Sequence, residues 1–262
     1  MRSLYWEVHE GNGPYLLLVH GFLSSRAQWR LNLDAFREYA TPVVAELWGH
    51  GRSPRASSGE HCRPHYYLAQ FERIRAELGA ERWLLCGQSL GASLTLRYAL
   101  TYPERVIAQA FTNSNSAFAD EALLRQRYDD AKTAIADIET RGIAGVEALR
   151  VHPRHAKRLP EGVHEELLTD ARGIEPLAIT DSYRHLNLES SVRDTVSQTQ
   201  VPTMLAFGRF EKRFVPYRDF ALDTIPGLHH VTLDAGHPVN IQAAEPFNIH
   251  VGDFFRRHIA SS

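Results

Sequence analysis

The chain has 262 residues, of which 44% are hydrophobic and 23% charged, and its formal net charge is −2 at pH 7. This composition is ample for the core of one large α/β domain or of two small ones. The nearly balanced charge gives no electrostatic reason to expect nucleic acid or an anionic membrane as a partner.

The sequence indicates neither secretion nor insertion into a membrane. No apolar run approaches the roughly 20 residues that a spanning helix needs, and the first residues lack the apolar region of a signal peptide. The two cysteines, Cys62 in a polar stretch and Cys86 in an apolar run, are too few for a disulfide framework. We therefore expect a cytoplasmic protein with reduced thiols.

Continuous apolar runs, typical of strands buried on both faces of a sheet, recur along the chain. They cover residues 15–19, 43–47, 83–86, 106–111, 203–207 and 230–233. Helical spacing lies between them, with apolar side chains repeating at intervals of 4 and 3 at Tyr67, Phe71, Ile74 and Leu78, and again at Phe247, Val251 and Phe254. The alternation predicts an α/β fold with a mostly parallel central sheet and helices on both faces.

The segment 116–196 breaks this rhythm. It contains a helix-like run over 122–138, a turn between Gly142 and Gly145, and a patch rich in histidine and arginine over 151–158, but no convincing buried strand. We therefore expect residues 1–115 and 197–262 to form one core, with residues 116–196 inserted between two of its strands as a helical segment.

The pentapeptide Gly87-Gln88-Ser89-Leu90-Gly91 is the most informative motif. It follows the apolar run 83–86 and leads into a helix-like stretch over 92–100. A serine held on a glycine-lined turn between a strand and a helix is how one common class of enzymes exposes a nucleophile. The motif is short, so its meaning depends on what else lies at the same edge of the sheet.

Polar side chains follow two further strands at that edge. In an open parallel sheet, functional groups collect at the carboxyl ends of the strands. The run 203–207 is followed by Gly208-Arg209-Phe210-Glu211, and the last strand by Ala235-Gly236-His237. A serine, an acid and a histidine are therefore expected close together, in that order along the chain.

These three residue types suit nucleophilic attack on a carbonyl group. A serine hydroxyl is a poor nucleophile until a base removes its proton, and a neutral histidine can be that base and later protonate the leaving group. The acid orients the imidazole and stabilises its charged form. The other reading of Glu211 is a surface carboxylate next to Lys212 and Arg213.

With these landmarks in order, the chain resembles the α/β-hydrolase fold superfamily over nearly its full length. The matching pieces are His-Gly-Phe at 20–22, Gly-His-Gly-Arg-Ser at 49–53, the pentapeptide at 87–91, Gly-x-x-acid at 208–211 and Ala-Gly-His at 235–237. The resemblance implies a core sheet, a helical cap at 116–196, and a triad of Ser89, His237 and Glu211.

The resemblance also implies which backbone groups form the oxyanion hole, and it leaves two candidates for the acid. The backbone N–H groups of Phe22 and Leu90 are the expected oxyanion donors. The acid of this family is more often aspartate, so Glu211 departs from the pattern. Asp120 is the alternative, because it follows the strand at 106–111, where some relatives carry the acid. His20 and His50 are expected to be structural.

The cap of this family usually lines the substrate pocket. We expect substrate-binding side chains at Leu23, Gln88 and Arg172. The cap is basic for a lipid-binding lid, and either a small substrate that bears a carboxylate or simple exposure to water explains this. The basic residues are His152, Arg154, His155, Lys157, Arg158, Arg172, Arg184 and His185.

The expected reaction is hydrolysis of an ester, thioester or lactone of a small molecule through an acyl-enzyme, without a metal or cofactor. One alternative is a C–C bond hydrolase or a lyase of the menaquinone-pathway type, which would use the same triad. Another, of a different class, is a ligand receptor with little turnover. The sequence leaves the oligomeric state open.

Overall fold

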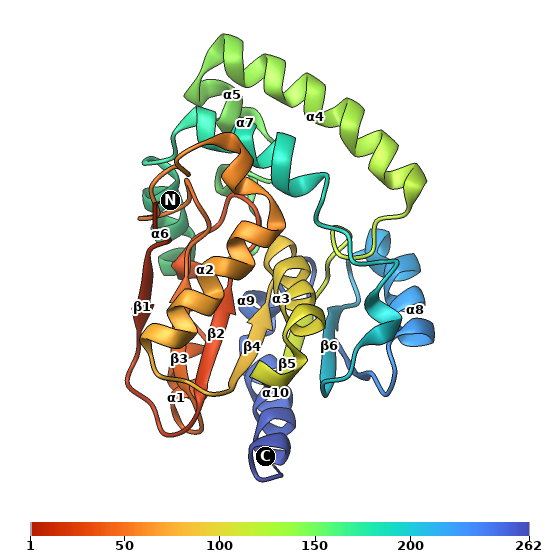
Figure 1. Cartoon of the computed structure of the whole chain (residues 1–262). Helices are drawn as coiled ribbons and strands as arrows, with labels where there is room; N and C mark the ends of the chain where they lie inside the picture. The colour runs from red at the N-terminus through yellow and green to blue at the C-terminus, as the bar shows by residue number, and fades with distance from the viewer. Residues whose placement is uncertain (1, 262) are drawn as a thin grey trace.

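The computed structural model describes residues 2–261 and is built around one twisted sheet of seven strands (Figure 1). The strands are β1 (Trp6–Val8), β2 (Tyr15–Val19), β3 (Thr41–Ala45), β4 (Trp83–Gly87), β5 (Val106–Thr112), β6 (Thr203–Gly208) and β7 (His229–Leu233). Their order is β1-β3-β2-β4-β5-β6-β7, and only β1 pairs antiparallel with its neighbour. The predicted fold class is therefore confirmed.

Strands β2 to β6 are largely buried on both faces, which explains their continuous apolar runs. The prediction of a buried strand over 230–233 is wrong in this respect, because β7 lies at the edge of the sheet and only its Leu233 is buried. Side chains of a strand alternate between its two faces, so Leu17 and Val19 of β2 pack into one core, while Leu16 and Leu18 pack into the other. Each fully buried leucine contributes about 1.5–3 kcal/mol of stability. The short strand β1 was not predicted, because its three residues are only partly covered and carry no such run.

Helices cover the two faces of the sheet in separate layers. In Figure 1, α2 (Pro64–Glu77) and α3 (Leu90–Thr101) lie in front of the sheet, and α10 (Ala244–Ile259) lies behind it together with α1 (Leu33–Arg37) and α9 (Val239–Gln242). Helix α8 (Val215–Thr224) packs beside β6. The predicted helical stripe of α2 is buried as expected, since Tyr67, Phe71 and Ile74 all pack into the first core.

The chain between β5 and β6 is described throughout, and none of it forms a strand. It contains α4 (Glu121–Arg141), α5 (Ile143–Ala148), α6 (Glu161–Ala171), α7 (Pro176–Ser182) and a π-helical turn (Tyr183–Asn187). Figure 1 shows α4, α5 and α7 across one end of the sheet, the end at which β2 and β4 terminate. We retain 116–196 as the proposed limits of this cap.

The environment of Cys62 differs from the prediction of a polar loop. Its side chain is buried beside Tyr67 at the end of a short 3₁₀ helix (Gly59–Cys62), although its sequence neighbours are polar. Burial, with a smaller contribution from Asp181, raises the pKa of the Cys62 thiol to about 12. Burial also raises the pKa of Cys86 on β4. Neither cysteine forms a disulfide. Within residues 2–261, the helices are too short or too polar to cross a bilayer.

Candidate active site

Ser89 occupies a strained turn between β4 and α3. Its φ of 53° and ψ of −113° are unusual for a residue with a side chain, and such conformations cost on the order of 1–3 kcal/mol. The flanking glycines make the turn possible. A Cβ on Gly87 would lie 2.6 Å from the Cα of Ala92, and one on Gly91 would lie 2.1 Å from the carbonyl oxygen of Val19. The turn leaves the half-buried Ser89 side chain at the end of the strand.

The three predicted residues come together at this edge of the sheet. The Nε2 atom of His237 lies 2.8 Å from the Oγ of Ser89. The Nδ1 atom of the same ring lies 3.0 and 2.9 Å from the two carboxylate oxygens of Glu211. A proton on Nδ1 donates to the carboxylate and leaves Nε2 free to accept from the serine hydroxyl. The side chain of His237 is 45% exposed, so solvent and substrate reach it.

The Glu211 carboxylate is held ionised by its neighbours. Burial alone would raise its pKa, because only 18% of the side chain is exposed. The hydrogen bond and charge of His237 and a hydrogen bond from Asn113 outweigh burial, and the pKa of Glu211 falls below its ordinary value. The carboxylate is thus charged at neutral pH and can stabilise an imidazolium.

Asn113 was not among the predicted site residues. It is fully buried at the end of β5, where its Nδ2 donates to Glu211 Oε2 at 2.6 Å and its Oδ1 accepts from the Gly208 N–H at 3.0 Å. It therefore joins the loop after β6 to the strand beside it. The signal was present in the sequence, because β5 ends in a polar run from Thr112 to Ser116 at the same edge of the sheet.

Asp120, the alternative acid, has a different role in the structure. It is exposed at the N-terminus of α4, where its carboxylate accepts a hydrogen bond of 2.8 Å from the Leu123 N–H. This is an ordinary helix cap. Within residues 2–261, the carboxylate that contacts His237 is that of Glu211, so this structure does not favour the alternative.

The N–H groups of Phe22 and Leu90 are free to serve as oxyanion donors. Within residues 2–261, neither group donates to another protein atom. His20 shapes the loop that carries Phe22, as predicted: its Nδ1 donates to the Gly21 carbonyl at 2.7 Å and its Nε2 accepts from the Leu47 N–H at 3.1 Å. Leu90 opens α3, so its N–H also lies at the positive end of a helix dipole.

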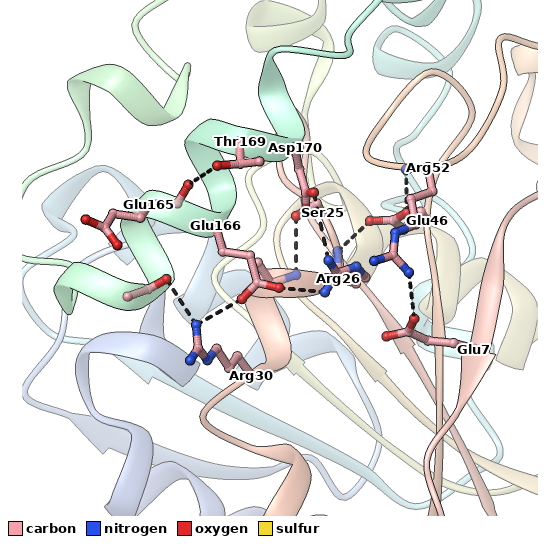
Figure 2. A network of polar contacts seen from close by, with 12 residues as sticks. Glu7, Ser25, Arg26, Arg30, Glu46, Arg52, Glu165, Glu166, Thr169 and Asp170 are labelled. Atoms are coloured by element: carbon pink, nitrogen blue, oxygen red, sulfur yellow. Dashed lines mark hydrogen bonds and ion pairs between the residues drawn. The ribbon is translucent and has the colours of Figure 1, made fainter.

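A buried carboxylate holds the same loop from the other side (Figure 2). Glu46, at the end of β3, accepts hydrogen bonds from the backbone N–H groups of Arg26 at 2.9 Å and Arg52 at 2.7 Å. The guanidinium of Arg26 then pairs with Glu166 at 2.6 Å and lies 4.0 Å from Asp170, both on α6. The polar network of Figure 2 therefore fixes the loop after β2 and ties it to the cap.

His20 and His50 are buried and uncharged. Burial is the main cause that lowers the pKa of His20 to about 3, with a smaller contribution from His50, and burial lowers the pKa of His50 to about 4. In the unfolded chain each would titrate near 6.5. Between about pH 6.5 and 4 the unfolded chain binds more protons, so the free energy of unfolding falls as the pH falls.

We expect His50→Asn to weaken this acid sensitivity. Asparagine keeps a donor for the Trp48 carbonyl, which His50 Nδ1 contacts at 3.0 Å, but it does not titrate. The slope of unfolding free energy against pH should fall by at most about 1.4 kcal/mol per pH unit between pH 6 and 4.5. Urea unfolding at several pH values measures this slope, and equal slopes for variant and wild type would contradict the assignment.

Two cavities meet at Ser89 and His237. One, of about 390 Å³, extends toward α4 and is lined in part by Phe22 and Leu90. The other, of about 320 Å³, extends toward α6 and is lined in part by Phe22, Leu23 and Gln88. The structure thus places Leu23 and Gln88, two of the predicted substrate-binding residues, at a cavity beside the serine.

Arg172, the third predicted substrate-binding residue, lines neither of these two cavities. It is exposed just beyond the end of α6. Leu167 of that helix lines the cavity that extends toward α6. Arg172 lies five residues further, about 140° round the helix axis, and therefore on a different side of the helix from Leu167. Other basic residues of the cap pair on the surface, such as Arg184 with Glu139 and Arg154 with Glu147.

A mostly parallel sheet that carries a serine on a strained strand-to-helix turn is the defining feature of the α/β-hydrolase fold. A model of the alpha/beta hydrolase fold family matches residues 14–244, and the chain belongs to this family. A probable proline iminopeptidase of Streptomyces coelicolor is 36% identical over an alignment of 134 residues that covers 45% of this chain and 40% of that protein.

Two further comparisons fit this assignment. A (lyso)-N-acylphosphatidylethanolamine lipase of Mus musculus is 35% identical over 96 residues, 35% of this chain and 27% of that protein. The matches thus span 40% or less of the length of these two curated relatives. The solved structure of MenH from S. aureus superposes with a TM-score of 0.84 at 17% identity and covers 97% of this chain and 98% of that one, which shows the same fold.

Proposed function

We propose that the protein is a serine hydrolase that cleaves a carboxylic ester of a small molecule through an acyl-enzyme. The observation that carries the proposal is the continuous line of hydrogen bonds from Ser89 through His237 to Glu211. Thioesters and lactones present the same carbonyl chemistry and belong to the same proposal. The free N–H groups of Phe22 and Leu90 support it, because the tetrahedral intermediate needs donors already in place.

The reaction would proceed in two steps, acylation of Ser89 and hydrolysis of the acyl-enzyme. The Ser89 Oγ attacks the carbonyl carbon while its proton passes to His237 Nε2, and the carbonyl oxygen becomes negative between the two N–H groups. The intermediate then expels the alcohol, which takes the proton from His237. Water enters, loses a proton to the same nitrogen and attacks the acyl-enzyme. The bond to Ser89 Oγ then breaks as His237 returns the proton to that oxygen, so that the carboxylic acid leaves and the serine hydroxyl is restored.

The lyase alternative has one supporting observation, the arginines at the first cavity. Arg127 and Arg213 line it, but so do the carboxylates of Asp130 and Glu211. A polyanionic substrate would therefore meet as many negative as positive side chains in this cavity. We therefore place ester hydrolysis first.

Turnover of a simple activated ester tests the proposal. We expect p-nitrophenyl acetate to be hydrolysed over many turnovers, with release of p-nitrophenol continuing at a steady rate after the first equivalent. A receptor that merely retained the triad would release one equivalent or less and then stop. Absence of steady-state release from this ester and from longer-chain p-nitrophenyl esters would contradict the proposed activity.

A further inference from the structure

The two cavities that meet at Ser89 differ in their chemistry. Polar side chains gather in the cavity that extends toward α4, among them Asn115, Ser116, Arg127, Asp130, Asn187 and Arg213. The cavity toward α6 is lined mainly by apolar side chains, including Pro153, Leu159, Leu167 and Ile241, although Arg150 and His152 also line it. A substrate that fills both cavities therefore has one polar and one apolar part.

Two arginines line the polar cavity, but Arg213 is exposed to solvent whereas Arg127 is half-buried. Arg127 is therefore the arginine that depends more on a partner. Within residues 2–261 its guanidinium forms no ion pair, and its one hydrogen bond runs from Nη1 to the Ser116 hydroxyl at 3.2 Å. Other arginines of the same helix are paired: Arg125 contacts Glu121, and Arg141 lies 2.9 Å from Asp137. Those pairs join residues four apart, but the residue four before Arg127 is the apolar Leu123.

The environment of Arg127 makes an outside anion favourable. The side chain is half-buried, and burial lowers its pKa, although the charge of nearby Asp130 partly opposes this effect. A guanidinium withdrawn from water without a counter-ion is costly, and a bound carboxylate would restore the lost interactions with two parallel hydrogen bonds. Arg127, Arg213, Asp130 and Glu211 line the cavity, and Glu211 is already hydrogen-bonded to His237 and Asn113, so Arg127 remains the half-buried charge that a monoanion would pair.

Two amides strengthen the case for a polar ligand part. The Oδ1 atoms of Asn115 and Asn187 are buried and find no hydrogen-bond partner among residues 2–261, and both residues line the same cavity as Arg127. Buried polar atoms ordinarily have partners. A hydrocarbon group in this cavity would leave these atoms unsatisfied, whereas a polar ligand or its bound water would satisfy them.

From these observations we infer that the substrate carries a carboxylate which Arg127 binds in the polar cavity, while its apolar group occupies the cavity toward α6. The inference rests on the proposed ester hydrolysis and adds the substrate class: a small ester with one free carboxylate. Arg127 would be a specificity residue of the site, because it contacts the substrate away from the scissile bond.

Matched pairs of esters test the inference. One pair carries the charge on the acyl side, mono-4-nitrophenyl glutarate against 4-nitrophenyl hexanoate. The other carries it on the alcohol side, 3-acetoxybenzoate against 3-methylphenyl acetate. In at least one pair, wild type should prefer the carboxylated ester in kcat/KM. Arg127→Met should lower that ratio by about 10- to 100-fold, chiefly through KM, and Arg127→Lys should lower it less.

Arg125→Met is the matched control, because Arg125 lies on the same helix but does not line the cavity. It should leave the ratio unchanged. Equal use of both esters in both pairs by wild type, or an Arg127→Met ratio equal to that of wild type, would overturn the inference. Such a result would leave the proposed activity standing, since the neutral esters are still hydrolysed. Failure to hydrolyse any ester would instead refute the proposed function.

Discussion

Replacement of Ser89 by alanine is expected to lower kcat for p-nitrophenyl acetate by at least about 10³-fold. The variant lacks the oxygen that forms the acyl-enzyme, and His237 then has no hydroxyl to activate at 2.8 Å. The fold should survive, because alanine adds no atom to the turn and the glycines at 87 and 91 still allow its close crossing. Steady-state kinetics beside a urea unfolding curve measures both effects.

The control for Ser89→Ala is Ser93→Ala. Ser93 is fully buried one turn further along α3, near Ser114, and does not line either cavity. It should retain most of the activity. Retained activity in Ser89→Ala with an intact fold would rule out the serine mechanism.

Glu211→Gln is expected to have the second largest effect, a loss of about 10²- to 10⁴-fold in kcat. The carboxylate accepts from two donors, His237 Nδ1 and Asn113 Nδ2. Glutamine has only one acceptor oxygen, and its NH₂ group is a donor. Its NH₂ group therefore faces the N–H of His237 or of Asn113, and two donors cannot form a hydrogen bond with each other. The neutral amide also fails to stabilise an imidazolium. Kinetics at several pH values separates loss of the histidine tautomer from a general loss of structure.

The matched control is Asp120→Asn, which also removes one carboxylate near the same edge of the sheet. Asp120 only caps α4, and asparagine is about as good a cap. We expect its kcat to stay within about two-fold of wild type. The reverse ranking, a severe loss in Asp120→Asn and little in Glu211→Gln, would move the acid to Asp120.

Much of the fold and the central residues of the site could be predicted, because both depend on short-range patterns. Strands buried on both faces are continuous apolar runs, and parallel strands bring their carboxyl ends to one edge. Ser89, Glu211 and His237 each lie within four residues of the end of a strand, β4, β6 and β7 respectively, although β7 itself is largely exposed. The short strand β1 lacked the pattern, since its residues are half covered and its only partner is β3.

The substrate-binding residues could not be predicted as well, because they depend on how the cap sits. The helical pattern of α4 tells which of its faces is apolar but not what that face covers. The basic cap residues therefore looked equivalent in the sequence. The structure turns Arg127 toward the cavity and Arg172 toward solvent. Asn113 was not predicted for another reason. It follows a strand directly, but an uncharged amide is not one of the residue types expected to act as nucleophile, acid or base.

The central claim is that Ser89 becomes acylated during turnover. The most direct measurement is mass spectrometry of the protein quenched during hydrolysis of a slowly released ester such as 4-nitrophenyl trimethylacetate. The account predicts one added acyl group on the peptide that contains Ser89, formed at least as fast as steady-state turnover and absent in Ser89→Ala. Turnover without an acylated Ser89, or acylation at another residue that persists in Ser89→Ala, would contradict it.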